Sequence, residues 1–150
     1  MTTTPMNNQR LDSIIREHAD TIHDGRPGYW QFDYYGHTLI VLTDENHNRM
    51  RIISPAFPVG EMNEELAMVC LSANFDRALD ARYAISGDFV WSAFIHPLQQ
   101  LDVSSFVDAM TQVATLAATF GTSFNSSGLS FGGGEDDAAE GDGDATETAG

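Results

Sequence analysis

The sequence contains no lysine, so its permanent positive charges are seven arginines. The sequence also contains 22 aspartates and glutamates, so the formal net charge of the 150 residues is −15. A P-loop requires a lysine for the nucleotide phosphates, so that kind of site is excluded. Seven of the acidic residues lie in residues 135–147, but the other 15 still outnumber the arginines. Because a nucleic-acid binder needs clustered cations that displace counterions from phosphates, we expect no nucleic-acid partner.

Cysteine is nearly absent as well, since Cys70 is the only one and no internal disulfide can form. A chain of this kind suits a reducing compartment. No apolar run approaches the roughly 18 residues that a membrane span needs. The first residues lack the basic segment followed by an apolar stretch that marks a signal peptide. We therefore expect a cytoplasmic protein with no membrane contact.

The apolar residues that are present recur with helical spacing in three places. The first predicted helix begins at about Asn8 and continues to Ile22, before the breaking sequence Gly25-Arg26-Pro27-Gly28. The second covers about 62–74. The third is capped by Asp102 and ends at Gly121. The positions that define the stripes are Leu11, Ile14, Ile15, His18 and Ile22; Met62, Leu66, Val69, Cys70 and Ala73; and Val103, Phe106, Val107, Met110, Val113, Ala114, Ala117 and Phe120.

Between the helices, alternating and β-branched residues predict strands. Tyr35-Gly36 and the loop 86–88 indicate two hairpins, and Pro55 and Pro58 are expected to end the middle strand. The predicted strands are 29–34, 38–42, 49–54, 79–85 and 89–96. The fold class is therefore α+β, in the order α-β-β-β-α-β-β-α, with an antiparallel five-stranded sheet packed by helices.

The predicted domain organisation has three parts. Residues 1–8 are a flexible N-terminus, and 9–121 form the α+β domain. Residues 122–150 form a Gly/Ser/acidic tail that has almost no apolar side chain to bury beyond 132 and is expected to be largely disordered.

This pattern resembles the type III secretion chaperone-like fold, in particular its YbjN-type branch. The similarity covers about residues 9–121. It rests on the element order, on the small acidic body, and on the run from Leu71-Ser-Ala-Asn-Phe through the Ser86-Gly87-Asp88 hairpin to the long last helix. The resemblance implies a non-enzymatic protein, often dimeric, that holds or regulates another polypeptide. The functional residues of that family are not tied to a motif, so no residue role is transferred.

The sequence contains no catalytic motif in the context that the motif requires. Gly128-Leu129-Ser130-Phe131-Gly132 matches the G-x-S-x-G nucleophile elbow, but that motif needs a later acid and histidine, and no histidine follows His96. Cys70 lies on an apolar helix side without a basic neighbour, which favours a core position. His18 and His23 are five residues apart and fall on different helix faces, so they do not form a metal pair. We expect no catalytic residue, no metal and no cofactor.

The sheet carries the more informative signal. With a turn at Tyr35-Gly36, Phe32 faces Leu39 and Trp30 faces Val41. With a three-residue loop at 86–88, Tyr83 faces Trp91. The predicted core face is then Trp30, Phe32, Leu39, Val41, Leu79, Tyr83, Ile85, Phe89, Trp91 and Ile95, and the opposite face holds an apolar group of Tyr29, Ile40, Leu42, Val90 and Phe94.

That second apolar group predicts a partner or dimer interface, since a solvated face is usually more polar. The second helix of the same chain is the alternative cover. The sequence thus favours a non-enzymatic protein-binding domain, a homodimer that holds or regulates an unidentified polypeptide. Two alternatives remain open: a small acid-rich hydrolase or metal-dependent enzyme, whose carboxylates (Asp33, Asp80 and Asp88 among them) meet only in three dimensions, and a structural subunit of a larger assembly.

Overall fold

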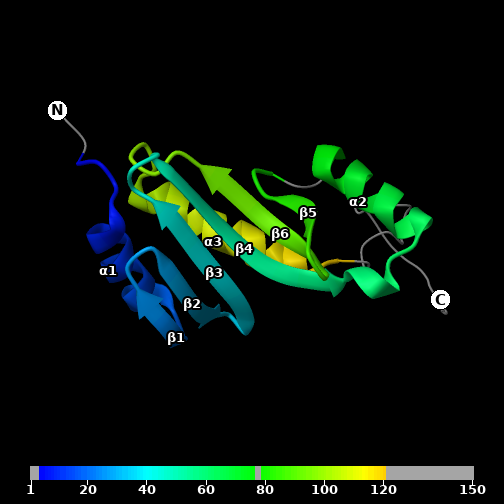
Figure 1. Ribbon diagram of the computed structural model, residues 1–150, viewed down its shortest axis with the longest axis horizontal. Helices are drawn as coiled ribbons and strands as arrows, with labels where there is room; N and C mark the ends of the chain where they lie inside the picture. Colours follow the sequence, from blue (N-terminus) through cyan, green and yellow to red (C-terminus); the bar gives the residue numbers. More distant parts are fainter. Residues whose placement is uncertain (1–3, 77–78, 121–150) are drawn as a thin grey trace.

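The computed structural model describes residues 4–76 and 79–120, which form one sheet and three α-helices (Figure 1). The α+β class and the antiparallel sheet are confirmed, but the sheet has six strands where five were predicted. The elements are α1 (Asn8–His18), β1 (Thr21–Arg26), β2 (Tyr29–Tyr34), β3 (His37–Asp44), β4 (Arg49–Pro58), the short 3₁₀ helix Val59–Glu61, α2 (Glu64–Asp76), β5 (Arg82–Ser86), β6 (Phe89–His96) and α3 (Val103–Ala118).

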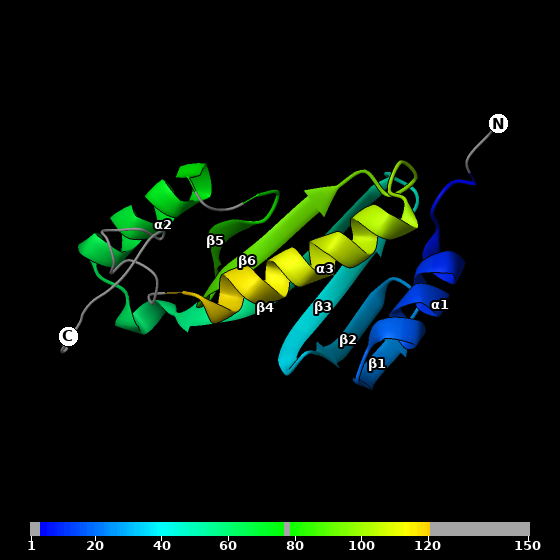
Figure 2. The same cartoon turned by 180° about the vertical axis from the view of Figure 1, so that it is seen from behind.

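The strands lie in the order β1-β2-β3-β4-β6-β5, each antiparallel to its neighbours. Figure 2 shows α3 crossing one face of this sheet, with α1 beside it on the same side. The sheet turns its other face forward in Figure 1, and no helix of the described residues lies over it. Helix α2 sits beyond β5 at the end of the sheet. One face is therefore core, and the other is open.

The additional strand is β1, and it corrects the predicted length of the first helix. Helix α1 ends at His18, because Ala19 is extended (φ −71°, ψ 144°) and the backbone N–H of Asp20 donates to the carbonyl of Asp33. Ile22 matched the helical spacing, but it lies in β1 opposite Phe32. The sequence Pro27-Gly28 then forms the turn between β1 and β2, with Gly28 at φ +93°.

Strand β4 continues through the two prolines that were expected to end it. It pairs with β3 only as far as Ile53, while on its other side it pairs with β6 up to Pro58. Beyond Ser54 it is thus an edge on the β3 side, where a residue without an N–H is tolerated. A bulge between Pro55 and Phe57 absorbs the remaining irregularity.

The second hairpin differs from its prediction by one residue, and the difference exchanges the faces of β6. The turn is the two residues Gly87 and Asp88, so Ser86 pairs with Phe89 and Tyr83 pairs with Ser92. A slip of one residue moves every side chain of a strand to the other face. The residues of β6 that face the core are accordingly Val90, Ser92 and Phe94, whereas Phe89, Trp91 and Ile95 face the other way. The register of the first hairpin, with Trp30 opposite Val41, is confirmed.

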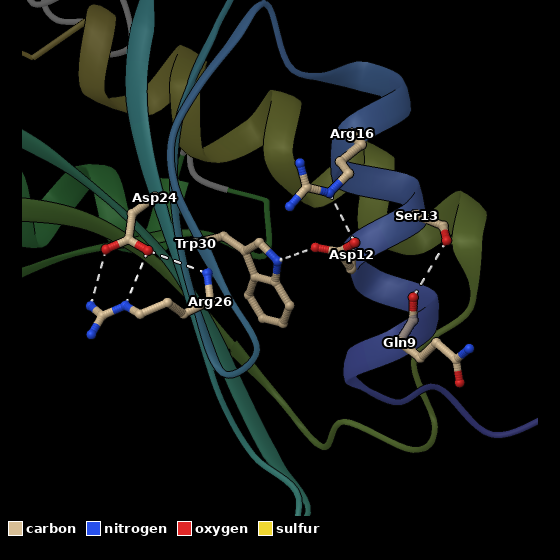
Figure 3. A network of polar contacts seen from close by, with 7 residues as sticks. All are labelled: Gln9, Asp12, Ser13, Arg16, Asp24, Arg26 and Trp30. Carbon is tan, nitrogen blue, oxygen red and sulfur yellow. Dashed lines mark hydrogen bonds and ion pairs between the residues drawn. The ribbon is translucent and has the colours of Figure 1, made fainter.

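Helix α1 is fixed to the core face by a buried tryptophan. Figure 3 shows the indole of Trp30 and the guanidinium of Arg16 both pointing toward Asp12. Trp30 Nε1 donates to Asp12 Oδ1 at 3.0 Å, and Arg16 Nε donates to Asp12 Oδ2 at 2.9 Å. These hydrogen bonds, with that from Arg16 the larger, lower the pKa of Asp12. The contact holds α1 on the side away from the open face.

Candidate protein-binding surfaces

The open face of the sheet, which we call the outer face, is largely apolar. Alternation along each strand places on it the side chains that do not enter the core. Several of them are half-buried by their neighbours, although no helix in the described part of the chain covers them. Ile95 is 60% exposed. The outer face is made up of Tyr29, Gln31, Ile40, Leu42, Arg51, Ile53, Trp91, Ala93 and Ile95.

These side chains form continuous rows across the strands. One row joins cross-strand partners in the order Tyr29, Leu42, Arg51 and Ile95. The next joins Gln31, Ile40, Ile53 and Ala93. Directly opposite residues have Cβ atoms about 4.5–5.5 Å apart, so the apolar members touch. The centre of the outer face is therefore apolar, with Arg51 as the one charged residue inside these two rows. The rows end at charged residues, since Arg26 lies opposite Tyr29, Asp24 opposite Gln31 and Arg82 opposite Ala93.

The five residues predicted to form an interface are divided by the structure. Tyr29, Ile40 and Leu42 do share the outer face. Val90 and Phe94 lie on the core face, 2% and 6% exposed, because of the one-residue change in the second hairpin. The alternative cover is also wrong for the described residues, since α2 packs beside β5 and not over this face (Figure 1). The role of the outer face as an interface remains a prediction.

Sequence reasoning missed a second apolar surface, on α2 and around β5. Phe75 is 91% exposed, and Met68, Leu71 and Phe75 follow one another at helical spacing. The side chains of α2 that are buried, Cys70 and Ala73, are both small. The sequence pattern could have predicted this surface, because α2 is apolar on more than one side. That pattern is typical of a helix that is packed against neighbours on two sides. We call the exposed set Met68, Leu71, Phe75, Leu79 and Ile85 the α2–β5 surface.

A groove of about 260 Å³ runs between α2 and β5 beneath this surface. Asn74 closes one end of the contact: its Nδ2 donates to the carbonyl of Tyr83, and its Oδ1 accepts from the N–H of Tyr83. One amide side chain thereby satisfies both backbone groups of a residue on the edge strand. The groove is lined by Met62, Ala67, Cys70, Leu71, Asn74, Tyr83, Ala84, Ile85 and Val90.

The predicted alternatives to a binding role involve carboxylates and histidines, and Asp33 and Asp80 each have a different hydrogen-bond partner. Asp33 accepts from His23, at 3.1 Å, while Asp80 accepts from Gln112 of α3, at 3.2 Å. His18 is bonded to the carbonyl of Ile14 within its own helix. Within residues 4–76 and 79–120, there is no group of three or more His, Cys, Asp or Glu residues that could hold a metal ion. Gly128–Gly132 and the predicted tail 122–150 lie outside the described residues.

Cys70 faces the groove but is not poised as a nucleophile. It is 7% exposed, and burial raises the pKa of its thiol from 9.0 to about 11. We expect the native protein to react with iodoacetamide at neutral pH about 100-fold more slowly than a thiol of pKa 9.0, because the thiolate is the reacting form. The urea-unfolded chain should react at the ordinary rate, as measured by intact mass over time. Fast labelling of the native protein would contradict this.

The fold defined by these elements is similar to that of several solved structures of type III secretion chaperones and related complexes. One similar structure is the Yersinia pestis type III secretion chaperone SycH in complex with a stable fragment of YscM2 (TM-score 0.54, 13% identity, 75% of this chain and 98% of that chain). A second is the HopA1–SchA chaperone–effector complex (TM-score 0.55, 15% identity, 73% of this chain and 88% of that chain). A third is the ExsC–ExsE complex (TM-score 0.54, 12% identity, 75% of this chain and 92% of that chain). At these identities the similarity establishes the fold. No family model and no curated protein matches the chain.

None of the helices in the described part of the chain combines the length and apolar character needed to cross a lipid bilayer.

Proposed function

We propose that this protein is a non-enzymatic binding domain that holds or regulates another polypeptide in the cytoplasm, and that the outer face receives this client. The observation that carries the proposal is an apolar sheet face that no helix of the described residues covers. An apolar surface of this kind on a monomer commonly marks a binding site. The fold supports the same function, since the similar structures include chaperones solved together with a protein partner. A YbjN-type regulatory role fits the proposal equally well.

The protein acts as a homodimer in this proposal, with the α2–β5 surface buried between two copies. Most stability of a short helix comes from packing of its apolar side, and the two buried side chains of α2, Cys70 and Ala73, are both small. A second copy would cover Leu71 and Phe75, which are 64% and 91% exposed. The outer face, on a different side of the sheet, then stays free for the client.

The client site is tested by replacing Ile53 at the centre of the outer face with asparagine. Ile53→Asn removes apolar area between Ile40 and Ala93 without adding a charge. We expect client capture from native lysate, quantified by mass spectrometry against the wild type, to fall about tenfold, which corresponds to the burial of one aliphatic side chain.

The matched control is Val103→Asn at the start of α3, where an exposed valine lies on the covered side of the sheet. The control should capture the same proteins as the wild type. Equal capture by Ile53→Asn and the wild type would refute the client site, provided that circular dichroism shows both variants folded.

A further inference from the structure

The arginines of the described residues divide into two groups. Four of the six are engaged: Arg10 donates to the carbonyls of Thr4 and Pro5, Arg16 to Asp12, Arg26 to Asp24, and Arg82 to the carbonyls of Leu79 and Ala81. The side chains of Arg49 and Arg51, two residues apart on β4, make no hydrogen bond or ion pair within residues 4–76 and 79–120. In a chain with 22 acidic residues, two arginine side chains with no polar partner in the described part of the chain need an explanation.

Both of these arginines lie on the open side of the sheet. Arg51 stands in a cross-strand row between Leu42 and Ile95, so its neighbours on either side are apolar. Arg49 is opposite Asp44, but the carboxylate of Asp44 is bound to Nδ1 of His47 at 2.8 Å. A shallow depression of about 500 Å³ at this end of the sheet is lined by Leu42, Thr43, Asp44, Arg49, Met50, Arg51 and Ile95.

A partner that covers the row must satisfy Arg51. An arginine cannot lose its proton in a protein, and burial of an unpaired charge is strongly unfavourable. A purely apolar segment laid over Leu42 and Ile95 would take the guanidinium of Arg51 out of water without a partner. A carboxylate supplies that partner and forms charge-assisted, often bidentate hydrogen bonds, which strengthen when water is excluded.

The rest of the molecule limits how acidic the partner can be. The net charge of −15 repels a run of carboxylates at long range. At physiological ionic strength this repulsion is screened beyond about 8 Å, so the local arginine pair decides the contact. The chemistry that fits is an apolar extended segment with an isolated acidic side chain.

We propose that the outer face binds an extended client segment whose apolar side chains lie over Ile40 and Ile53 and whose single carboxylate pairs with Arg51, with Arg49 beside it at the rim. This inference rests on the proposed function and names the chemistry of the client.

The experiment pans random peptides displayed on phage against three full-length proteins: the wild type, Arg51→Gln, and the control Arg16→Gln. Arg16 is an exposed arginine of α1, on the covered side of the sheet, that already pairs with Asp12. Peptides selected on the wild type and on the control should carry one Asp or Glu among β-branched or aromatic residues. Those selected on Arg51→Gln should lose the acid and keep the apolar pattern.

The best wild-type peptide is then compared with its Glu-to-Gln version by fluorescence anisotropy. We expect the amide version to bind the wild type about tenfold more weakly than the acidic version does. On Arg51→Gln the two versions should bind with equal affinity. The difference on the wild type should shrink at high salt.

Three outcomes would overturn the inference. If the acidic and amide peptides bind the wild type equally, the pairing of a client carboxylate with Arg51 is refuted. The proposed function stands in that case, provided that Ile53→Asn still weakens the binding of both peptides. If peptides bind only after deletion of residues 133–150, the partner of Arg49 and Arg51 is the acidic segment of the same chain and not a client carboxylate. Failure to enrich any peptide, or binding insensitive to Ile53→Asn, would contradict the proposed function as well.

Discussion

Phe94→Asp unfolds the domain, whereas the same substitution at the next residue, Ile95→Asp, leaves it folded. Phe94 is 6% exposed on the core face of β6, opposite Ile52 of β4. Loss of a buried phenylalanine costs about 3–5 kcal/mol, and an unpaired carboxylate in its place adds to that cost. The sum approaches the whole stability of a small domain, about 5–15 kcal/mol. Ile95 is 60% exposed, so its aspartate stays in water.

Circular dichroism and a urea titration of the two variants measure this difference. The pair is a direct test of strand register, because the alternative three-residue loop at 86–88 exchanges the two positions. If that register were correct, Ile95→Asp would unfold the domain and Phe94→Asp would not.

Phe75→Asp on α2 is expected to convert the dimer to a monomer. Phe75 is 91% exposed in the single chain and is the aromatic member of the α2–β5 surface. In a symmetric dimer the substitution acts twice, and it places two carboxylates in an apolar contact. Loss of an interface aromatic residue commonly costs about 2 kcal/mol, which is about 4 kcal/mol for the two copies, so the dissociation constant should rise by about 1000-fold.

Sedimentation equilibrium of the wild type, Phe75→Asp and the control Val103→Asp measures the association. Val103 is an exposed apolar residue on α3, away from α2, and its substitution should leave the mass unchanged. Because the side chain of Phe75 is exposed, the variant should keep its circular dichroism spectrum. A wild type that is monomeric at all concentrations would refute the dimer.

The parts of the fold that follow from local rules were predictable. Asp102 caps α3 by accepting from the N–H of Ser105, and the long apolar stripe of that helix packs on the sheet. The turn Tyr35-Gly36 fixes the first hairpin, with Gly36 at φ +81° and Tyr35 at φ +50°. These elements need little information from distant residues.

The parts that failed depend on tertiary pairing. Ile22 suits a helix stripe and a β-strand equally, and only its pairing with Phe32 decides between them. On β6, Ser92 suggested a solvated face, yet it is fully buried, and its hydroxyl has no hydrogen-bond partner among the described residues. This wrong register is the reason that Val90 and Phe94 were predicted to share a face with Tyr29, Ile40 and Leu42. The α2–β5 surface was missed because exposure of an apolar helix depends on what packs against it.

The two tryptophans stand on opposite faces of one sheet, which gives the molecule two separate optical reporters. Trp30 is fully buried and bonded to Asp12, so its emission should be that of a rigid, dry indole and should change when the domain unfolds. Trp91 lies on the outer face with its indole N–H bonded to the carbonyl of Ser86, within reach of anything that covers the sheet. With one tryptophan replaced by phenylalanine, fluorescence reports folding through Trp30 or occupancy of the outer face through Trp91.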